Sequence, residues 1–279
     1  MKINKPKNSV EEIYTSCISH YRDPNKKKLM QKILPNIIND ENRYKEELKS
    51  HKLYEETAHI THDINIDSED LTKLYTDKLV KRVDGLNFYD KLLAGSESCP
   101  YCAKRLVSTL DHYLSKSNYP NFSITPLNLV PCCTECNKNK SDKDDSLMGI
   151  TDLLYHPYEE SLPIKKWLKA EINLIDSRLF FTFRVIPNNV PSDDYIRLNN
   201  YIKKLKLDEY YAKEANVEIR RRTPKYKRLY ASGGEKALLD YFNDCMYDSQ
   251  DLEHGVNTFE YVYFEACVTY IDTLVLVLK

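Results

Sequence analysis

The sequence predicts a mainly helical protein with a small zinc-stabilised core of two strands and a helix, and a short β-hairpin in its C-terminal part. Only 6 of the 279 residues are glycine, which favours helices because glycine costs a helix about 1 kcal/mol relative to alanine. Two Cys-x-x-Cys pairs in the middle of the chain have the spacing typical of ligands to tetrahedral zinc. They are Cys99 with Cys102 and Cys133 with Cys136. Alternating apolar residues predict the hairpin near 170–186.

These patterns divide the chain into three regions. At 279 residues the chain exceeds one average domain and can bury a real core, so zinc need not hold up the whole fold. We expect a helical N-terminal region at 1–94, the zinc core at 95–145 and a mostly helical region with the hairpin at 146–279.

Composition limits the function classes. The formal net charge is −1 with 30% charged residues, so any nucleic-acid contact has to come from a local basic patch. No long apolar run is present, and the first residues lack the apolar segment of a signal peptide. We therefore expect a cytoplasmic protein without a membrane span, whose cysteines outside the two pairs are reduced thiols.

One-faced apolar spacing predicts four helices in the N-terminal region. Their starts are marked by a capping box of Ser9 with Glu12, by Asp23-Pro24, by about Glu41 and by Ser68. Pro35 should kink the second helix or end it early. His59 and His62 could be metal ligands, but without a third partner nearby, solvated or buried histidines are the favoured interpretation.

The segment between the cysteine pairs contains the residues that look arranged for chemistry. Thr109–Leu114 and Leu127–Val130 read as strands, and the polar segment Thr134–Lys140 as a short helix. The first strand contains the pair Asp111-His112, Asn128 lies in the second, and Asn137 directly follows the last cysteine. A bare four-cysteine pattern alone would favour a zinc ribbon without catalysis.

Together these residues resemble the HNH endonucleases of the ββα-metal family. Asp111-His112 stands where the family has its first pair, Asn128 is its central asparagine, and Asn137 takes the third position. The separations of sixteen residues from His112 to Asn128 and nine from Asn128 to Asn137 are typical of the motif. Ser115 departs from it, because relatives often carry proline there, and we expect loop rigidity rather than activity to be affected.

Roles for these residues follow from their chemistry. Asp111 and Asn137 offer the oxygen donors that Mg²⁺ or Mn²⁺ prefers, and His112 titrates near neutral pH, so it can take a proton from an attacking water. The resemblance implies that Asn128 braces the loop and orients the histidine. Lys140, one turn after Asn137, can meet the phosphate, with Lys138 and Lys143 as weaker candidates. The four paired cysteines form a closed structural zinc site, and the adjacent Cys132 is the spare cysteine.

The C-terminal region has four further features. Ala170–Ile175 and Leu179–Ile186 form the hairpin, separated by 176–178. His156-Pro157-Tyr158 and the single Trp167 favour an aromatic plug between this region and the preceding one. Helices follow over Tyr195–Leu205 and from about Asp208, and Asn257 with Glu260 opens a one-faced helix that is either core or a partner surface.

A basic run carries six cations in nine residues, with Pro224 ending the helix among them. It comprises Arg220, Arg221, Arg222, Lys225, Lys227 and Arg228. Clustered guanidinium groups suit a phosphate backbone, but a solvated helix end, where cations complement the macrodipole, is an equal alternative.

The wider layout is similar to the HNH proteins of bacterial anti-phage defence modules such as Septu, which work beside an ATPase of the ABC or SMC-like type. The resemblance implies a metal-dependent endonuclease, with DNA as the favoured substrate and an ATPase as a possible partner. Two alternatives stay open: an RNase, for example against transfer RNA, and a zinc-stabilised nucleic-acid-binding or adaptor subunit that never cleaves.

Overall fold

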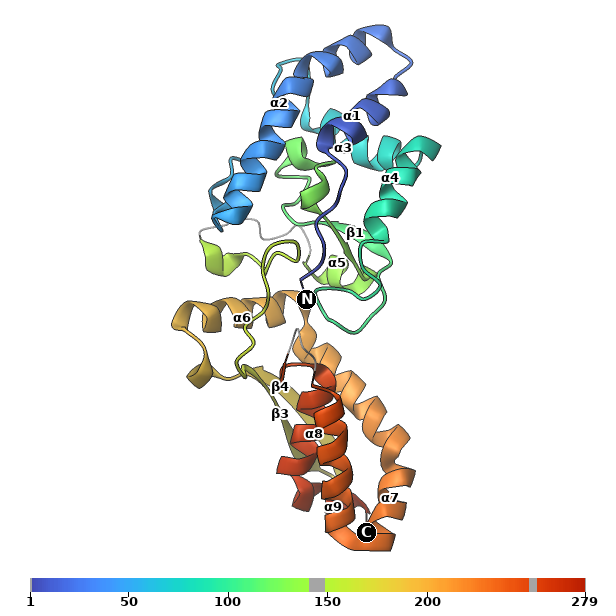
Figure 1. Ribbon diagram of the computed structural model, residues 1–279, viewed down its shortest axis with the longest axis vertical. Coiled ribbons are helices and arrows are strands. Elements are labelled where there is room, and N and C mark those ends of the chain that lie inside the picture. The colour runs from blue at the N-terminus through green and yellow to red at the C-terminus, as the bar shows by residue number, and fades with distance from the viewer. Residues whose placement is uncertain (1, 141–148, 251–254, 279) are drawn as a thin grey trace. The chain divides into compact units, whose positions relative to one another are not determined.

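The computed structural model describes residues 2–140, 149–250 and 255–278 (Figure 1). The chain is mainly helical with two small antiparallel hairpins, as the sequence predicts. Its residues cluster into two compact units, Met1–Ser161 and Leu162–Lys279. The segment 149–161 therefore packs with the first unit, whereas the pattern of the sequence had assigned it to the C-terminal region.

The first unit begins with two helices whose starts the sequence predicts correctly. Helix α1 spans Val10–Ser19 and opens with the capping box of Ser9 and Glu12. Helix α2 spans Pro24–Lys49 behind the N-cap Asp23. It does not end at Pro35 or restart near residue 41. Burial of Ile33 and Ile37 on either side of this proline, worth about 1.5–3 kcal/mol each, offsets its cost of about 3 kcal/mol.

The helical region and the first hairpin share one apolar core. Helix α3 (Ser68–Lys73) continues into a π-helical turn (Leu74–Leu79), and α4 (Val83–Leu93) follows. Tyr14, Ile33 and Leu74 from these helical segments are buried together with Leu110 and Leu129 of the hairpin. The helices thus fix the hairpin on which the candidate site is built.

The first hairpin consists of β1 (Thr109–His112) and β2 (Leu129–Cys132), and α5 (Thr134–Lys140) follows it directly. The strands pair antiparallel, with Asp111 opposite Val130 and His112 opposite Leu129. Strand β1 ends two residues earlier than predicted, and β2 begins and ends two residues later than predicted, so that Asn128 lies just before it. Beyond His112 the Asn128 side chain, not a backbone group, accepts from the Leu114 N–H, which ends regular pairing.

The second unit is built on the hairpin predicted near residues 170–186. Strands β3 (Leu168–Ile175) and β4 (Arg178–Val185) are joined by Asp176 and Ser177, whose φ values are 48° and 60°. Two positive φ values are the geometry of the tight two-residue turn that matches strand twist. Arg178 consequently belongs to the strand and not, as expected, to the loop.

Helices cover this hairpin. They are α6 (Ser192–Leu205), α7 (Leu207–Asp248), α8 (Phe259–Thr269) and α9 (Ile271–Leu278). Helices α7 and α8 pack on the hairpin and on each other (Figure 1). Aromatic contacts hold this layer together, since the Phe181 ring stacks on Tyr263 at 5.3 Å and the Phe183 ring lies 5.5 Å from Tyr211.

Three boundaries in the second unit differ from the sequence expectations. Helix α7 continues through Pro224, and its backbone leaves the helical region at Gly233 and Gly234, the latter with φ of 64°. The predicted final helix is two helices, α8 and α9. Its expected cap, Asn257, is not the N-cap: Thr258 caps α8.

Asn257 instead clamps the segment before the hairpin. Its Oδ1 accepts from the N–H groups of Trp167 and Leu168, and its Nδ2 donates to the carbonyls of residues 163, 164 and 165. Buried backbone polar groups need such partners, so a residue that looks like a helix cap in sequence serves a long-range contact.

Among the described residues, no single helix is both long and apolar enough to cross a membrane. Helices α8 and α9 would pass that test only as a pair bent by 81°.

Candidate active site

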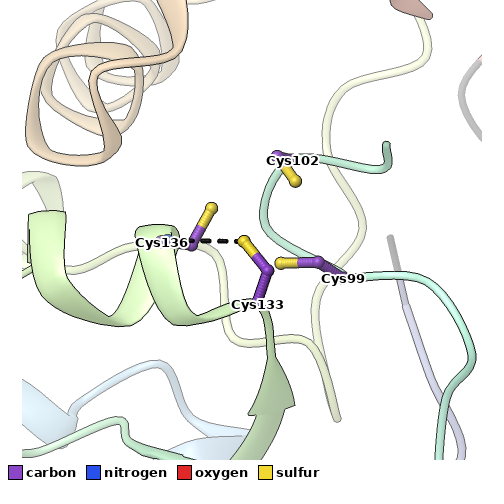
Figure 2. A group of neighbouring side chains, drawn as sticks. All are labelled: Cys99, Cys102, Cys133 and Cys136. Carbon is purple, nitrogen blue, oxygen red and sulfur yellow. Dashed lines mark hydrogen bonds between the residues drawn. The ribbon is translucent and has the colours of Figure 1, made fainter. Parts of the chain in front are cut away.

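Four cysteines converge at the base of the first hairpin. Cys99 and Cys102 come from the loop before β1, Cys133 directly follows β2, and Cys136 lies in the first turn of α5 (Figure 2). All four are buried, and their sulfur atoms lie within 4.8 Å of one another. A tetrahedral zinc ion with bonds of about 2.3 Å requires sulfurs about 3.8 Å apart. The cluster could therefore hold zinc after a small contraction.

Two sulfurs of the cluster accept backbone hydrogen bonds, which favour the thiolate, the form that binds zinc. The backbone N–H of Arg105 donates to Cys102 Sγ at 3.5 Å, and the N–H of Cys136 donates to Cys133 Sγ at 3.4 Å. Hydrogen bonds among the four cysteines hold the pKa of the Cys102 thiol well below its usual range and raise the pKa values of Cys99 and Cys136 far above theirs. Cys132 lies outside the group, and burial raises its pKa far above the ordinary value.

Asp111 lies on β1 with both carboxylate oxygens engaged. The Tyr101 hydroxyl donates to Oδ2 at 2.8 Å, and Lys140 Nζ from α5 lies 3.2 Å from Oδ1 and 3.1 Å from Oδ2. Lys140 also donates to the His112 carbonyl at 2.6 Å. An almost buried carboxylate is stable only when it is paired and hydrogen-bonded, and these two partners supply that.

His112, the next residue, is held in one orientation. Its Nε2 lies 2.8 Å from the carbonyl oxygen of Ser123, and its ring meets the Tyr75 ring edge-on at 4.3 Å. A carbonyl only accepts, so Nε2 carries the hydrogen and Nδ1 of the neutral ring carries the lone pair. No described residue hydrogen-bonds to Nδ1. Burial and, to a smaller extent, the charges of Lys116 and Lys140 lower the pKa of His112 to about 3, although the Ser123 hydrogen bond raises it. The ring therefore does not titrate near neutral pH, whereas the sequence had led us to expect that it would.

Asn128 is fully buried and uses both ends of its amide. Its Oδ1 accepts from the Leu114 N–H at 2.7 Å and from the Tyr44 hydroxyl at 3.2 Å. Its Nδ2 donates to the carbonyls of Leu114 at 3.0 Å and Phe122 at 3.1 Å. These bonds tie both sides of the loop between the strands, and this loop carries Ser123, the partner of His112. Asn128 therefore has the hydrogen bonds that the bracing role implied by the resemblance requires.

Replacing Asn128 with alanine should destabilise the protein by about 2–4 kcal/mol. The change leaves several buried groups without partners, and each such group costs about 1–3 kcal/mol. Urea unfolding followed by circular dichroism measures the difference. The matched control is Asn36→Ala, because Asn36 is exposed on α2 and alanine favours a helix there. Equal stability of the two variants would contradict the brace.

The third position of the motif, Asn137, lies on α5 with its side chain half-buried. Its backbone N–H donates to the Cys133 carbonyl at 3.1 Å, and its side chain makes no hydrogen bond with any described residue. Lys138 is exposed on the same helix, and Lys143 lies outside the described residues. Helix α5 thus presents Asn137 and Lys140, one turn apart, while Lys140 reaches Asp111.

The site includes three residues that sequence reasoning missed. Tyr101 holds Asp111, Ser123 holds His112 through its carbonyl, and Tyr44 of α2 holds Asn128. The sequence signal for Tyr101 was its position inside the first Cys-x-x-Cys pair, shortly before the strand that contains Asp111. The other two carry no local signal, since one acts through its backbone and the other is distant in sequence.

His62, His156 and Trp167 make contacts within their own units. The ring of His62 pairs with Asp40, and His156 is fully buried in the first unit with Nε2 3.2 Å from the Tyr44 hydroxyl. Trp167 belongs to the second unit, where its indole N–H donates to the Pro163 carbonyl at 3.0 Å. His156 and Trp167 thus belong to different units.

The basic run lies within α7, which does not end at Pro224 but leaves helical geometry at Gly233 and Gly234. Arg221 and Arg222 both bind Glu218, and Arg222 also donates to the Tyr241 hydroxyl at 2.9 Å. Lys225 Nζ lies 3.9 Å from the centre of the Tyr241 ring. Arg221, Arg222 and Lys225 therefore already interact with neighbouring residues of the second unit, which reduces the positive charge left for a phosphate backbone.

Comparison with known proteins gives little further guidance. No family model and no solved structure matches the chain. The chain is 28% identical over 160 residues to a protein described as ea31 of Escherichia phage lambda. The match covers 56% of this chain and 54% of the phage protein, so the chain spans about half the length of the curated relative that it matches.

Proposed function

We propose that the protein is a metal-dependent HNH endonuclease that hydrolyses phosphodiester bonds, with DNA as its substrate. The observation that carries this proposal is the arrangement of His112. Its Nε2 is fixed on the Ser123 carbonyl, which leaves Nδ1 of the neutral ring with a lone pair that no described residue uses. A ring that is held by one nitrogen and keeps the other free to accept a proton is the arrangement that general base catalysis needs.

The order of elements supports the same proposal. The first of two short antiparallel strands carries Asp111 and His112, Asn128 directly precedes the second strand, and the helix that follows carries Asn137 and Lys140. This is the order that the ββα-metal resemblance implies, with the cysteine cluster fastening the helix to the loop before β1. The cluster is closed around its four sulfurs, so zinc there would be structural.

The oxygen donors of Asp111 and Asn137 suit Mg²⁺ or Mn²⁺ in chemistry. When bound, such an ion supplies charge that polarises the phosphate and stabilises the leaving 3′ oxygen. His112 Nδ1 accepts a proton from the attacking water, and the Ser123 carbonyl stabilises the ring as it becomes charged. The products are 5′-phosphate and 3′-hydroxyl ends, as the resemblance implies.

Lys140 has two roles in this proposal. Without a metal its ammonium neutralises Asp111 at 3.1 Å, and with a metal bound to Asp111 it is released toward the phosphate. Both roles need a cation on α5 within reach of the hairpin.

Replacing Lys140 with methionine should therefore strengthen Mn²⁺ binding by about tenfold, because the competing charge within hydrogen-bond distance of Asp111 is removed. Cleavage should become slower, because a phosphate contact is lost. Calorimetric titration of Mn²⁺ into the zinc-loaded protein measures the affinity. Lys138→Met, an exposed neighbour on α5, should leave the affinity unchanged. Weaker Mn²⁺ binding in Lys140→Met would contradict the competition.

The proposal extends to a role in anti-phage defence in the bacterial cytoplasm, beside an ATPase. The support is the layout that the chain shares with defence-module HNH proteins. The name of the similar protein of phage lambda specifies no activity.

The test incubates the purified chain with plasmid DNA and with total RNA, each in Mg²⁺, Mn²⁺ or EDTA. We expect cleavage of DNA that EDTA abolishes and that the His112→Ala variant lacks. Metal-dependent cleavage of RNA alone would keep the chemistry and change the substrate to RNA. Absence of cleavage of both would contradict the nuclease and favour the non-cleaving zinc-stabilised adaptor.

A further inference from the structure

The second unit has an apolar groove that the nuclease chemistry does not use. The groove measures about 780 Å³, which lies within the range of ligand sites, about 300–1,000 Å³. It is formed by the tip of the β3–β4 hairpin, one face of α7 and the end of α9. These elements lie close together in Figure 1. All of its lining residues belong to the second unit.

The apolar part of the groove extends beyond what folding requires. Ile219 and Leu278 are buried at its base, whereas Val217 is 49% exposed and Phe180 is 42% exposed. Next to the lining residues, Ile175 at the hairpin tip and Leu276 on α9 are also exposed. Adjoining exposed apolar side chains of this kind mark interaction sites more often than isolated ones do.

The charge around the groove has one sign. Arg178, Lys213 and Arg220 line it, and no acidic residue is among its described lining residues. None of the three forms an ion pair with another described residue. Arg220 differs in this respect from the adjacent Arg221 and Arg222, which both form ion pairs with Glu218. Since the whole chain has 41 basic and 42 acidic residues, three unpaired cations around one apolar surface are a local feature.

The shape suits a helix or a short peptide. The lining face of α7 runs from Lys213 through Val217 and Arg220 to Thr223, a distance of about 15 Å at 1.5 Å per residue. That length matches two to three turns of a helix lying in the groove. A nucleic acid would offer bases to stack, but Phe180 is the one aromatic side chain among the described lining residues. The exposed aliphatic surface would gain little from phosphates.

We propose that this groove binds an amphipathic segment of a partner protein, with an apolar face against Val217 and Phe180 and acidic residues against Arg178, Lys213 and Arg220. The interaction is of the helix-in-groove type, in which apolar residues three and four apart provide the anchors and the charges orient the segment. It goes beyond the proposed nuclease and does not depend on it.

The test selects binders to the full chain from a library of random 16-residue peptides displayed on phage, after depletion on the Val217→Glu variant. We expect the enriched peptides to share apolar residues at helical spacing and an excess of Asp and Glu. One enriched peptide is then synthesised, and its affinity is measured by fluorescence anisotropy. Arg220→Glu and Val217→Glu should each weaken it about tenfold or more.

The matched control is Arg228→Glu, which makes the same charge change at an exposed position of α7 outside the groove. It should leave the affinity unchanged, and thermal unfolding confirms that each variant is folded. No enrichment, enrichment of basic peptides, or equal binding by Arg220→Glu and wild type would overturn the proposal. Binding of a single-stranded oligonucleotide that Arg220→Glu abolishes, without peptide enrichment, would assign the groove to nucleic acid and overturn it as well.

Discussion

The Cys133→Ser variant should lose its zinc and unfold the hairpin core, whereas Cys132→Ala should keep both. The two cysteines are adjacent and both buried, but only Cys133 has its sulfur within the four-cysteine cluster. Structural zinc contributes about 10–16 kcal/mol to the folding of small sites, and the whole stability of a domain is only about 5–15 kcal/mol. Loss of one ligand thus removes a large share of the stability of this core.

Zinc content by mass spectrometry and thermal unfolding by circular dichroism measure the two effects. Wild type and Cys132→Ala should each carry about one zinc per chain, as a four-ligand site requires. A chelator should lower the unfolding temperature of both to that of Cys133→Ser. Full zinc content in Cys133→Ser, or loss of zinc in Cys132→Ala, would show that the ligands are assigned wrongly.

Local sequence signals predicted the elements that local chemistry determines. The capping box at Ser9, the cap at Asp23 and the hairpin turn at Asp176 depend on neighbouring residues. The cysteine cluster was also predictable, because a Cys-x-x-Cys pair fixes two ligands within one turn of backbone. The order of two strands and a helix in this segment could also be predicted, because apolar runs and turn residues mark strands locally.

Features that depend on distant contacts could not be predicted. Pro35 and Pro224 lie inside continuous helices, because packing along the whole helix outweighs a local preference against proline. Asn257 resembles a helix cap but binds a segment about 90 residues earlier in the chain. In the candidate site, Tyr44 and the Ser123 carbonyl were missed because a hydroxyl on a distant helix and a backbone oxygen leave no pattern in the sequence.

His112→Ala should lower the rate of cleavage by about 10²–10⁴-fold, the usual contribution of a positioned general base. His112 does not belong to the cysteine cluster, so zinc content should not change. The matched control is His20→Ala, a histidine at the end of α1 far from the hairpin in sequence, which should cleave at the wild-type rate. Loss of zinc or of the folded state in His112→Ala would mean that lost cleavage says nothing about catalysis.

The pH dependence distinguishes this base from an ordinary solvent-exposed histidine. Burial lowers the pKa of His112 from 6.5 to about 3, so the ring stays neutral in the folded protein between pH 5 and 8. The His112 side chain should therefore impose no fall in the rate of cleavage between pH 7 and 5, where a histidine of pKa 6.5 would cost more than tenfold. An acid limb near pH 6.5 that disappears in His112→Ala would contradict the buried neutral base.

The lowered pKa of His112 should also make the free energy of unfolding depend on pH, in the direction set by proton binding to the unfolded chain. Below pH 6.5 the unfolded chain binds a proton to His112 and the folded chain does not. The contribution of His112 to the free energy of unfolding is therefore fully present above pH 6.5 and is lost as the pH falls toward 3. Between pH 7 and 5 the loss amounts to about 2 kcal/mol. His112→Asn should remove that part of the pH dependence. Urea unfolding of both proteins at pH 7 and pH 5 measures it, and identical pH dependence in the two would show that His112 is not buried as a neutral ring.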